Sequence, residues 1–135
     1  MSAASSRLYV VIGIVRNTRG QYLLSERRAH VHLGGLWEFP GGKLEAQETP
    51  FAALQRELFE ELGIQVLQAT PLIAFPFDYP ELKVWLDFWQ VLDYQGTPSS
   101  QEGQKLLWLD LPEIEHYPIP EASRPVLKAL RAATN

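Results

Sequence analysis

T-P-F-A-A-L-Q-R-E-L-F-E-E-L-G-I, residues 49–64, predicts a helix whose two ends are both marked in the sequence. Thr49 followed by Pro50 is typical of a helix start, because the threonine hydroxyl can cap the first turn and proline fits the first helical position. Gly63 is the matching stop, since glycine readily takes the left-handed conformation that ends helices. Four apolar residues between these ends recur with helical spacing and form one stripe expected to face the core: Phe51, Leu54, Leu58 and Leu62.

The same helix carries three glutamates on the flank of the apolar stripe. At about 100° per residue, Glu57, Glu60 and Glu61 occupy a separate arc about 100° wide. Glutamates three or four positions apart repel by roughly 0.2–0.5 kcal/mol per pair, and partly buried charges without partners cost more. One interpretation is a solvated acidic face with an ion pair between Arg56 and Glu60. The other is a site for Mg²⁺ or Mn²⁺, which prefer oxygen ligands and keep waters and phosphate oxygens in the remaining positions.

Just before this helix, F-P-G-G-K (residues 39–43) contains a glycine pair. Gly41 and Gly42 allow the backbone to approach a metal or a phosphate closely, although such a pair often marks only a turn. Lys43 is either a phosphate contact or an ordinary exposed lysine. A glycine pair followed by an acidic helix is more specific than either feature alone.

The rest of the chain predicts strands on both sides of the helix. Leu8–Val15 and Tyr22–Arg27, joined by the turn N-T-R-G, indicate a hairpin. The loop of residues 29–42 contains buried aromatic anchors. Three further strands and a closing helix follow: Val66–Phe75, Leu82–Leu92, Lys105–Leu109 and Glu121–Ala133. The second of these strands is too apolar for an exposed edge. This order predicts an α/β (α+β) fold with a mixed sheet between helices.

Composition limits the classes of protein to which the chain can belong. Its 135 residues are expected to form one domain, residues 1–135, with residues 1–6 disordered. A net charge of −4 argues against direct nucleic-acid binding, which usually needs a basic face, but permits a polyanionic ligand held through a cation. There is no cysteine, no apolar run long enough for a membrane span, and no signal-peptide core in M-S-A-A-S-S. We therefore expect a cytoplasmic protein without a membrane partner.

Residues 42–64 resemble the Nudix box, G-x(5)-E-x(7)-R-E-U-x-E-E-x-G-U with U a bulky aliphatic residue, at every fixed position. Further segments resemble the MutT-like branch of the Nudix hydrolases, and the similarity covers about residues 8–130: G-I-V-R-N (13–17), R-R-A (27–29), H-L-G-G-L-W-E-F-P-G-G-K (32–43), Q-E-G-Q (101–104) and E-A-S-R-P-V (121–126). The resemblance implies an α/β/α sandwich with a mixed central sheet. It also implies hydrolysis of nucleoside triphosphates, notably 8-oxo-dGTP, to the monophosphate and pyrophosphate.

The resemblance also implies roles for individual residues, with Mg²⁺ as cofactor and Mn²⁺ as a substitute. The expected metal ligands are Glu60, Glu61, the carbonyl of Gly42, Glu102 of the late loop, and Glu57. Glu57 matches the usual general base, Arg56 would hold it in place, and Glu48 would support the site or contact a metal-bound water. Glu102 remains the rival for the role of base.

For the nucleotide itself, the resemblance places Arg27, His32 and Phe39 where members of the branch contact the nucleotide. A surface arginine, a loop histidine and a core aromatic are the alternatives for these three residues. Ser123 stands where the branch prototype has asparagine, and a hydroxyl offers fewer hydrogen bonds than an amide. Selectivity for 8-oxoguanine is therefore open. A hydrolase for another nucleotide, such as a pyrimidine triphosphate, and a non-catalytic nucleotide-binding domain are the alternative functions, and either a monomer or a homodimer is expected.

Overall fold

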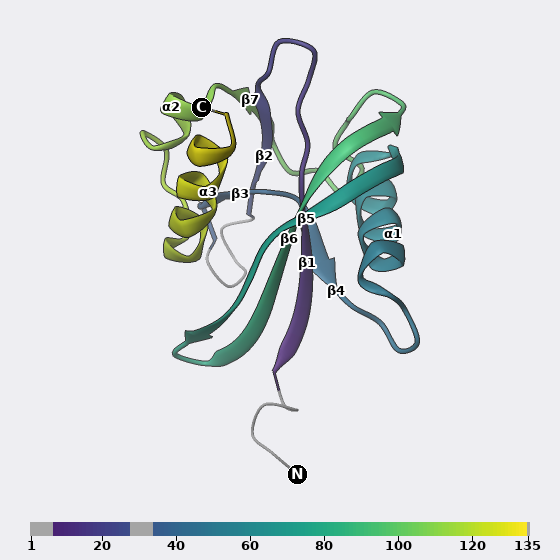
Figure 1. The fold of residues 1–135 in the computed structure, drawn as a ribbon, viewed down its shortest axis with the longest axis vertical. Helices are drawn as coiled ribbons and strands as arrows, with labels where there is room; N and C mark the ends of the chain where they lie inside the picture. Colours follow the sequence, from purple (N-terminus) through teal and green to yellow (C-terminus); the bar gives the residue numbers. More distant parts are fainter. Residues whose placement is uncertain (1–6, 28–33, 135) are drawn as a thin grey trace.

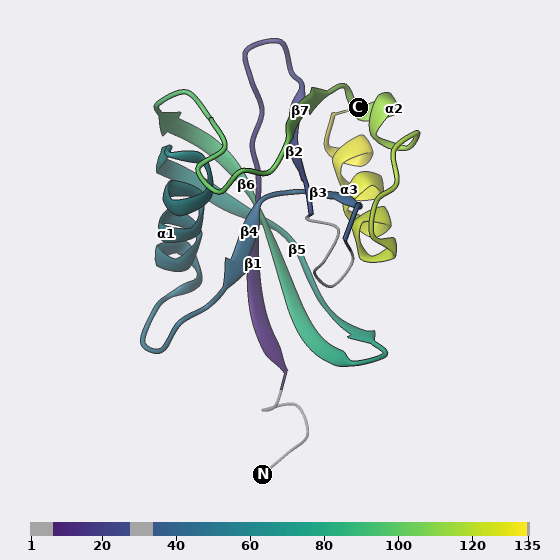
Figure 2. The same ribbon diagram turned by 180° about the vertical axis from the view of Figure 1, so that it is seen from behind.

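The computed structural model describes residues 7–27 and 34–134. The expected disorder of residues 1–6 and the expected contact of His32 lie outside the described residues. Helices cover the strands from two sides, with α1 (Pro50–Leu62) on one side and α3 (Arg124–Thr134) on the other (Figure 1). The view from behind shows the same arrangement (Figure 2). The predicted α/β arrangement is therefore confirmed.

The strands form two sheets. The four-stranded sheet has the order β4-β1-β6-β5, with these bounds: β4 Gly41–Lys43, β1 Leu8–Ile14, β6 Leu82–Gln95 and β5 Gln65–Tyr79. Because β1 and β6 are parallel while the other neighbours are antiparallel, this sheet is mixed, as predicted. The three-stranded sheet has the order β3-β2-β7, with these bounds: β3 Trp37–Glu38, β2 Tyr22–Glu26 and β7 Leu106–Leu109. Strand β6 lies inside its sheet, which agrees with its apolar sequence.

The predicted hairpin of the first two strands is wrong. The chain does turn back after β1, and the Asn17 Oδ1 atom accepts hydrogen bonds from the backbone N–H groups of Arg19 and Gln21. Beyond one isolated bridge, however, β1 and β2 enter different sheets. The physical reason is that β1 gains a seven-residue parallel ladder with β6, running from Leu8 opposite Val84 to Ile14 opposite Gln90. That partner is too far along the chain for a local pattern to predict.

Helix α1 has the predicted ends and the predicted buried stripe. The Thr49 Oγ1 atom accepts a hydrogen bond from the Ala52 N–H at 3.1 Å, and Gly63 ends the helix at φ 72°. Leu54, Leu58 and Leu62 are buried. A Cβ at Gly13 of β1 would lie 2.8 Å from the Leu58 Cδ2 atom, so a glycine there lets the helix pack closely on β1. This close packing brings the acidic flank of α1 against β4.

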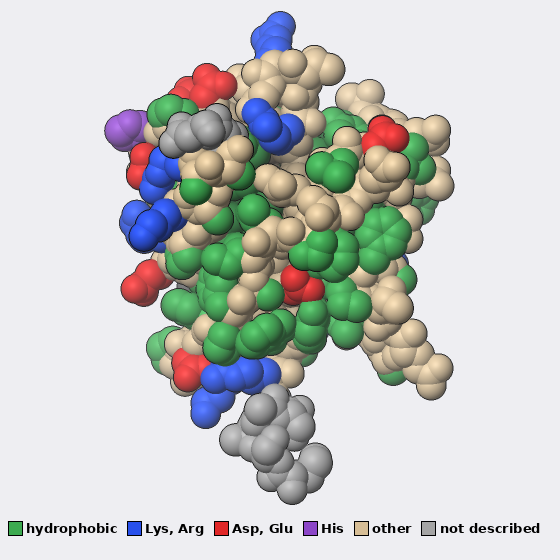
Figure 3. Space-filling model, in the orientation of Figure 1, with side chains coloured by type: hydrophobic (Ala, Val, Ile, Leu, Met, Phe, Trp, Pro, Cys, Tyr) green, Lys and Arg blue, Asp and Glu red, His purple; other side chains and the backbone are tan. Residues whose placement is uncertain are grey.

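The C-terminal part contains a short helix that the sequence did not indicate, α2 (Leu111–Ile114). The closing helix begins with a 3₁₀ turn, η2 (Glu121–Ser123), before the regular helix α3. Within the described residues, no helix is both long enough and apolar enough to cross a membrane. Hydrophobic side chains gather over the lower half of one face, where the β5–β6 hairpin lies (Figure 3).

Candidate active site

The guanidinium of Arg56 is the centre of a hydrogen-bond network beside α1. Its Nε and Nη2 atoms donate to the two carboxylate oxygens of Glu48 at 2.6 and 2.9 Å, and Nη2 also donates to the Lys43 carbonyl at 3.0 Å. The Nη1 atom donates to Glu57 at 3.0 Å and to Glu60 at 3.2 Å. These hydrogen bonds from Arg56 hold the pKa of Glu48 below its usual value. The network therefore ties the segment before α1 to the acidic flank of the helix.

Glu57 lies between this arginine and the glycine pair. Its side chain is only 16% exposed, and a Cβ at Gly42 would overlap its carboxylate. The absence of a side chain at Gly42 is thus what makes room for Glu57 against β4. Burial raises the pKa of Glu57, while the hydrogen bond from Arg56 opposes that rise.

Glu61 is the most strongly perturbed acid of the helix. Its Oε2 atom accepts a hydrogen bond from the Gly41 N–H at 3.1 Å. Burial, together with the negative charges of Glu57, Glu102 and Glu38, raises the pKa of Glu61 to about 8. Several acids therefore compete for the same small volume, and a cation placed among them would relieve the repulsion.

These acids line a polar recess of about 520 Å³. Glu57 and Glu61 enter it from α1, Gly41 from β4, and Glu102 from the connection between β6 and β7. Glu60 does not line this recess. Its side chain is 52% exposed and is paired with Arg56 on the outer side of the helix. Among the expected metal ligands, the structure thus brings Glu57, Glu61 and Glu102 together and leaves Glu60 apart.

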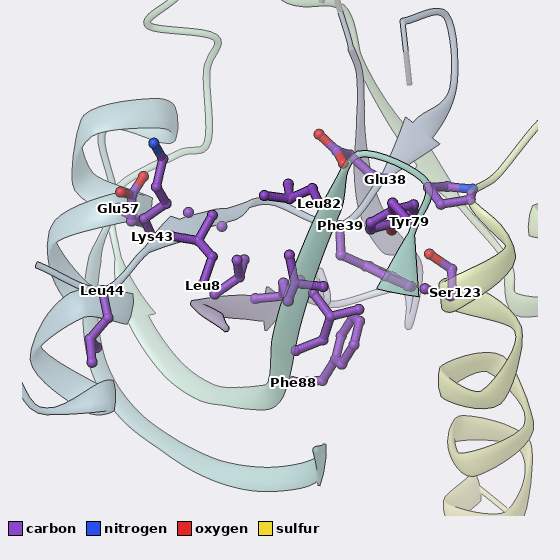
Figure 4. A pocket seen from close by; sticks show the side chains of 18 of the residues that line it. Leu8, Glu38, Phe39, Lys43, Leu44, Glu57, Tyr79, Leu82, Phe88 and Ser123 are labelled. Carbon is purple, nitrogen blue, oxygen red and sulfur yellow. The ribbon is translucent and has the colours of Figure 1, made fainter. Parts of the chain in front are cut away.

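A larger apolar pocket of about 650 Å³ adjoins the polar recess. Its floor comes from β1 and β6: Leu8, Val10, Ile12, Val84, Leu86 and Phe88. Phe39, Tyr79 and Ser123 lie at one end of the pocket, while Lys43 and Leu44 lie at the other (Figure 4). Both Phe39 and Ser123 are buried. Most of the residues that line the pocket are apolar, which suits an aromatic ring system.

An ion pair lies on the boundary between the two cavities. The Arg27 Nη1 atom donates to the Glu38 Oε2 atom at 3.0 Å, and both residues line the pocket and the recess. Burial raises the pKa of Glu38, and the charge of Arg27 opposes that rise. Gly41 and Glu57 also line both cavities, so the acids lie directly beside the apolar pocket.

Comparison with known proteins decides the family. A profile described as NUDIX domain matches residues 11–129. The chain belongs to the Nudix family. It is a Nudix pyrophosphohydrolase related to the 8-oxo-dGTP diphosphatases.

Relatives that are named for two different substrates have similar sequence identity to this Nudix hydrolase. It is 34% identical to the 8-oxo-dGTP diphosphatase of Escherichia coli K12 over 93% of this chain and 97% of that one. It is 35% identical to the CTP pyrophosphohydrolase of the same organism, over 93% of both chains. The identity to the relatives therefore leaves the substrate open.

Solved structures of similar proteins agree with the fold of this Nudix hydrolase. A structure from a study of MutT of Aliivibrio salmonicida and Vibrio cholerae has a TM-score of 0.79 and 38% identity, covering 95% of this chain and 99% of that one. The solution structure of the E. coli ORF135 protein has a TM-score of 0.83 and 35% identity, covering 98% and 94% of the two chains.

Nudix enzymes typically use a divalent metal ion. Within residues 7–27 and 34–134, no three acidic, histidine or cysteine side chains converge closely enough to enclose an ion as they stand. The donor chemistry nevertheless fits a hard cation, because the recess offers carboxylate oxygens, and burial together with neighbouring negative charges raises the pKa of Glu61. A cation there would occupy the space that the acids already share.

Among the residues that line the two cavities, Glu38, Tyr79 and Gln104 are polar side chains to which the sequence analysis gave no role. For Glu38 a signal exists, because it stands between the buried aromatics Trp37 and Phe39 and must face the opposite way along the strand. Tyr79 ends a long strand and Gln104 lies in a loop, and neither position shows a pattern that predicts its place in the site.

Proposed function

We propose that this Nudix hydrolase is an Mg²⁺-dependent nucleoside triphosphate pyrophosphohydrolase that acts on 8-oxo-dGTP and dGTP. The products would be the monophosphate and pyrophosphate, and the cytoplasmic role would be to remove oxidised nucleotides before they cause mutations. The observation that carries this proposal is that the apolar pocket lies beside the acidic recess and shares Glu57 and Gly41 with it. A base in the pocket directs its phosphates toward the acids.

In the proposed mechanism, Glu57 takes the proton of the water that attacks phosphorus, and Arg56 fixes the direction of its carboxylate. Glu48 holds Arg56 in turn through two hydrogen bonds. Bound Mg²⁺ would neutralise the phosphate oxygens and the pyrophosphate leaving group. Glu61, Glu102, the Gly42 carbonyl and Glu60 would hold the ion.

We assign the apolar pocket to the base. Phe39 would pack against the ring, Ser123 would offer its hydroxyl, and Arg27 would lie between the base and the phosphates. Lys43, at the opposite end of the pocket (Figure 4), would contact a phosphate.

A cytidine nucleotide is the second candidate substrate. Two observations favour it: the similarity to the E. coli CTP pyrophosphohydrolase and the single hydroxyl of Ser123 in the lining of the pocket. An asparagine amide offers both a donor and an acceptor to the edge of an oxidised guanine, whereas the serine hydroxyl offers a single donor and would bind that edge less tightly. A pyrimidine base is smaller than a guanine and would leave the end of the pocket at Ser123 to water.

A substrate panel at constant Mg²⁺ separates the two candidates. We expect kcat/KM for 8-oxo-dGTP to exceed that for dGTP, CTP and dCTP, with pyrophosphate as a product in each case. Equal values for 8-oxo-dGTP and dGTP would contradict the sanitising role, and the highest value for CTP would select the second candidate.

A further inference from the structure

Glu102 lies on an exposed connection between β6 and β7, outside any helix or strand. This connection is attached to the last turn of α1 by two backbone hydrogen bonds. The Ser99 N–H donates to the Leu62 carbonyl at 3.0 Å, and the Gln101 N–H donates to the Glu61 carbonyl at 2.9 Å. Carbonyls in the last turn of a helix have no partner within the helix, so the connection binds where acceptors are available.

Two side chains of the connection reinforce this attachment. The Gln101 Nε2 atom donates to the Ser99 Oγ atom at 2.8 Å and lies close to the Ser99 carbonyl at 3.4 Å. The Gln101 side chain also packs on Gly63, because a Cβ at that glycine would lie 3.0 Å from the Nε2 atom. The residue that ends α1 therefore also leaves the space into which the connection fits.

We propose that Ser99 and Gln101 are positioning residues that hold the connection on α1 and thereby place the Glu102 carboxylate opposite Glu57 and Glu61. Glu102 lines the polar recess together with these two acids, and it directly follows Gln101 in the chain. The inference rests on the proposed function, in which Glu102 contributes to metal binding. It adds that the metal site depends on two residues that do not touch the metal.

The test is a double-mutant cycle that uses Mn²⁺ binding by the nucleotide-free protein as its main readout. Ser99→Ala and Gln101→Ala are each made in the native chain and in a Glu102→Gln chain. In the native chain we expect each to weaken Mn²⁺ binding by about 3–10-fold, the effect of one lost hydrogen bond. In the Glu102→Gln chain the same changes should have no further effect, because the group they position is gone.

Steady-state kinetics provide a second readout, in which kcat should fall while KM for the nucleotide changes little. Ser99→Thr keeps the hydroxyl and should restore native Mn²⁺ binding. Thr97→Ala removes an exposed hydroxyl from the same connection and serves as the matched control, with native binding expected. Thermal melts check that every variant is folded.

Equal losses in the native and Glu102→Gln chains would overturn the inference, because the two residues would then act on something other than Glu102. Unchanged Mn²⁺ binding in Ser99→Ala and Gln101→Ala would overturn it as well. If the native chain hydrolysed no nucleotide while the cycle still showed coupling, the proposed function would fail and the positioning role would stand.

Discussion

Glu57 accepts a hydrogen bond from the Arg56 Nη1 atom at 3.0 Å, and its carboxylate fills the space that a side chain at Gly42 would occupy. Its side chain therefore has little rotational freedom. Burial raises its pKa, which strengthens it as a base, and Arg56 keeps the ionised form accessible. A general base needs both a fixed direction and a pKa closer to neutrality than an ordinary carboxylate has.

Replacing Glu57 by glutamine keeps the shape of the side chain and removes its ability to accept a proton. We expect kcat to fall by at least roughly 100-fold, since a general base typically contributes about 10²–10⁴ in rate. Steady-state kinetics at saturating Mg²⁺ measure this effect. Glu115→Gln, which removes a charge that pairs with Arg131, is the matched control and should retain native turnover. Near-native turnover in Glu57→Gln would assign the base to Glu102 instead.

Individual residues differed in how far the sequence could predict their place. The contact of Arg56 with Glu60 agrees with the expected spacing, because the two residues lie one helical turn apart. The contact with the adjacent Glu57 was expected only from the resemblance to the Nudix box. The separation of Glu60 from the recess could not be predicted, since it depends on which neighbour Arg56 binds. Glu38 was missed because its partner Arg27 lies 11 positions away, just after the end of β2, and no local pattern relates the two residues.

At the scale of elements, α1 was predicted almost to the residue because its cap, its stripe and its stop are all local signals. The pairing of β1 was not predicted, because its neighbours β4 and β6 are distant in the chain. The same parallel pairing creates a polar contact on the α1 side of the sheet. The Tyr9 hydroxyl donates to the Asp87 Oδ2 atom at 2.6 Å, and Asp87 is buried at 6% exposure.

This contact predicts how stability changes in alkali. Burial, and then the interaction with Asp87, raises the pKa of Tyr9 from 10.0 to about 12. Because the folded state holds this proton more firmly than the unfolded state, the stabilisation is complete below pH 10 and is lost as the pH rises toward 12. Tyr9→Phe should lower the free energy of unfolding by about 1–3 kcal/mol at pH 7, since Asp87 loses its donor.

Urea denaturation of the native and Tyr9→Phe proteins from pH 7 upward measures that difference. We expect it to be constant to about pH 10 and to shrink above it. Absorbance titration of the phenolates supplies an independent check, because the substitution should remove one tyrosine that ionises near pH 12. If the tyrosine lost from the titration of Tyr9→Phe were instead one that ionises near pH 10, the assignment would be wrong.

At the scale of the whole molecule, β5 forms one edge of the four-stranded sheet, and hydrophobic side chains gather over the β5–β6 hairpin (Figure 3). Open edges invite pairing between molecules, and proline interrupts such pairing because it has no N–H to donate. Pro71 and Pro76 both lie in β5. We interpret them as protection of this edge.

Pro76→Thr should therefore promote self-association, because it adds an N–H and a β-branched residue to the edge strand. Sedimentation across a concentration series should show larger species at lower concentration than in the native protein. Ala74→Thr, an exposed position two residues earlier in β5, adds a β-branched residue without adding an N–H and should remain native-like. Equal association of both variants would show that the proline is not the protective feature.

The network around Arg56 has a consequence for protein engineering. The Arg56 guanidinium donates hydrogen bonds to three carboxylates and a carbonyl at once. Replacing any member of the network would therefore leave another member without a hydrogen-bond partner. A lysine ammonium has no such fork, and Arg56→Lys would not be a conservative change. A designer who wishes to graft this chemistry onto a new scaffold must transplant the loop, the glycine and the helix as one unit.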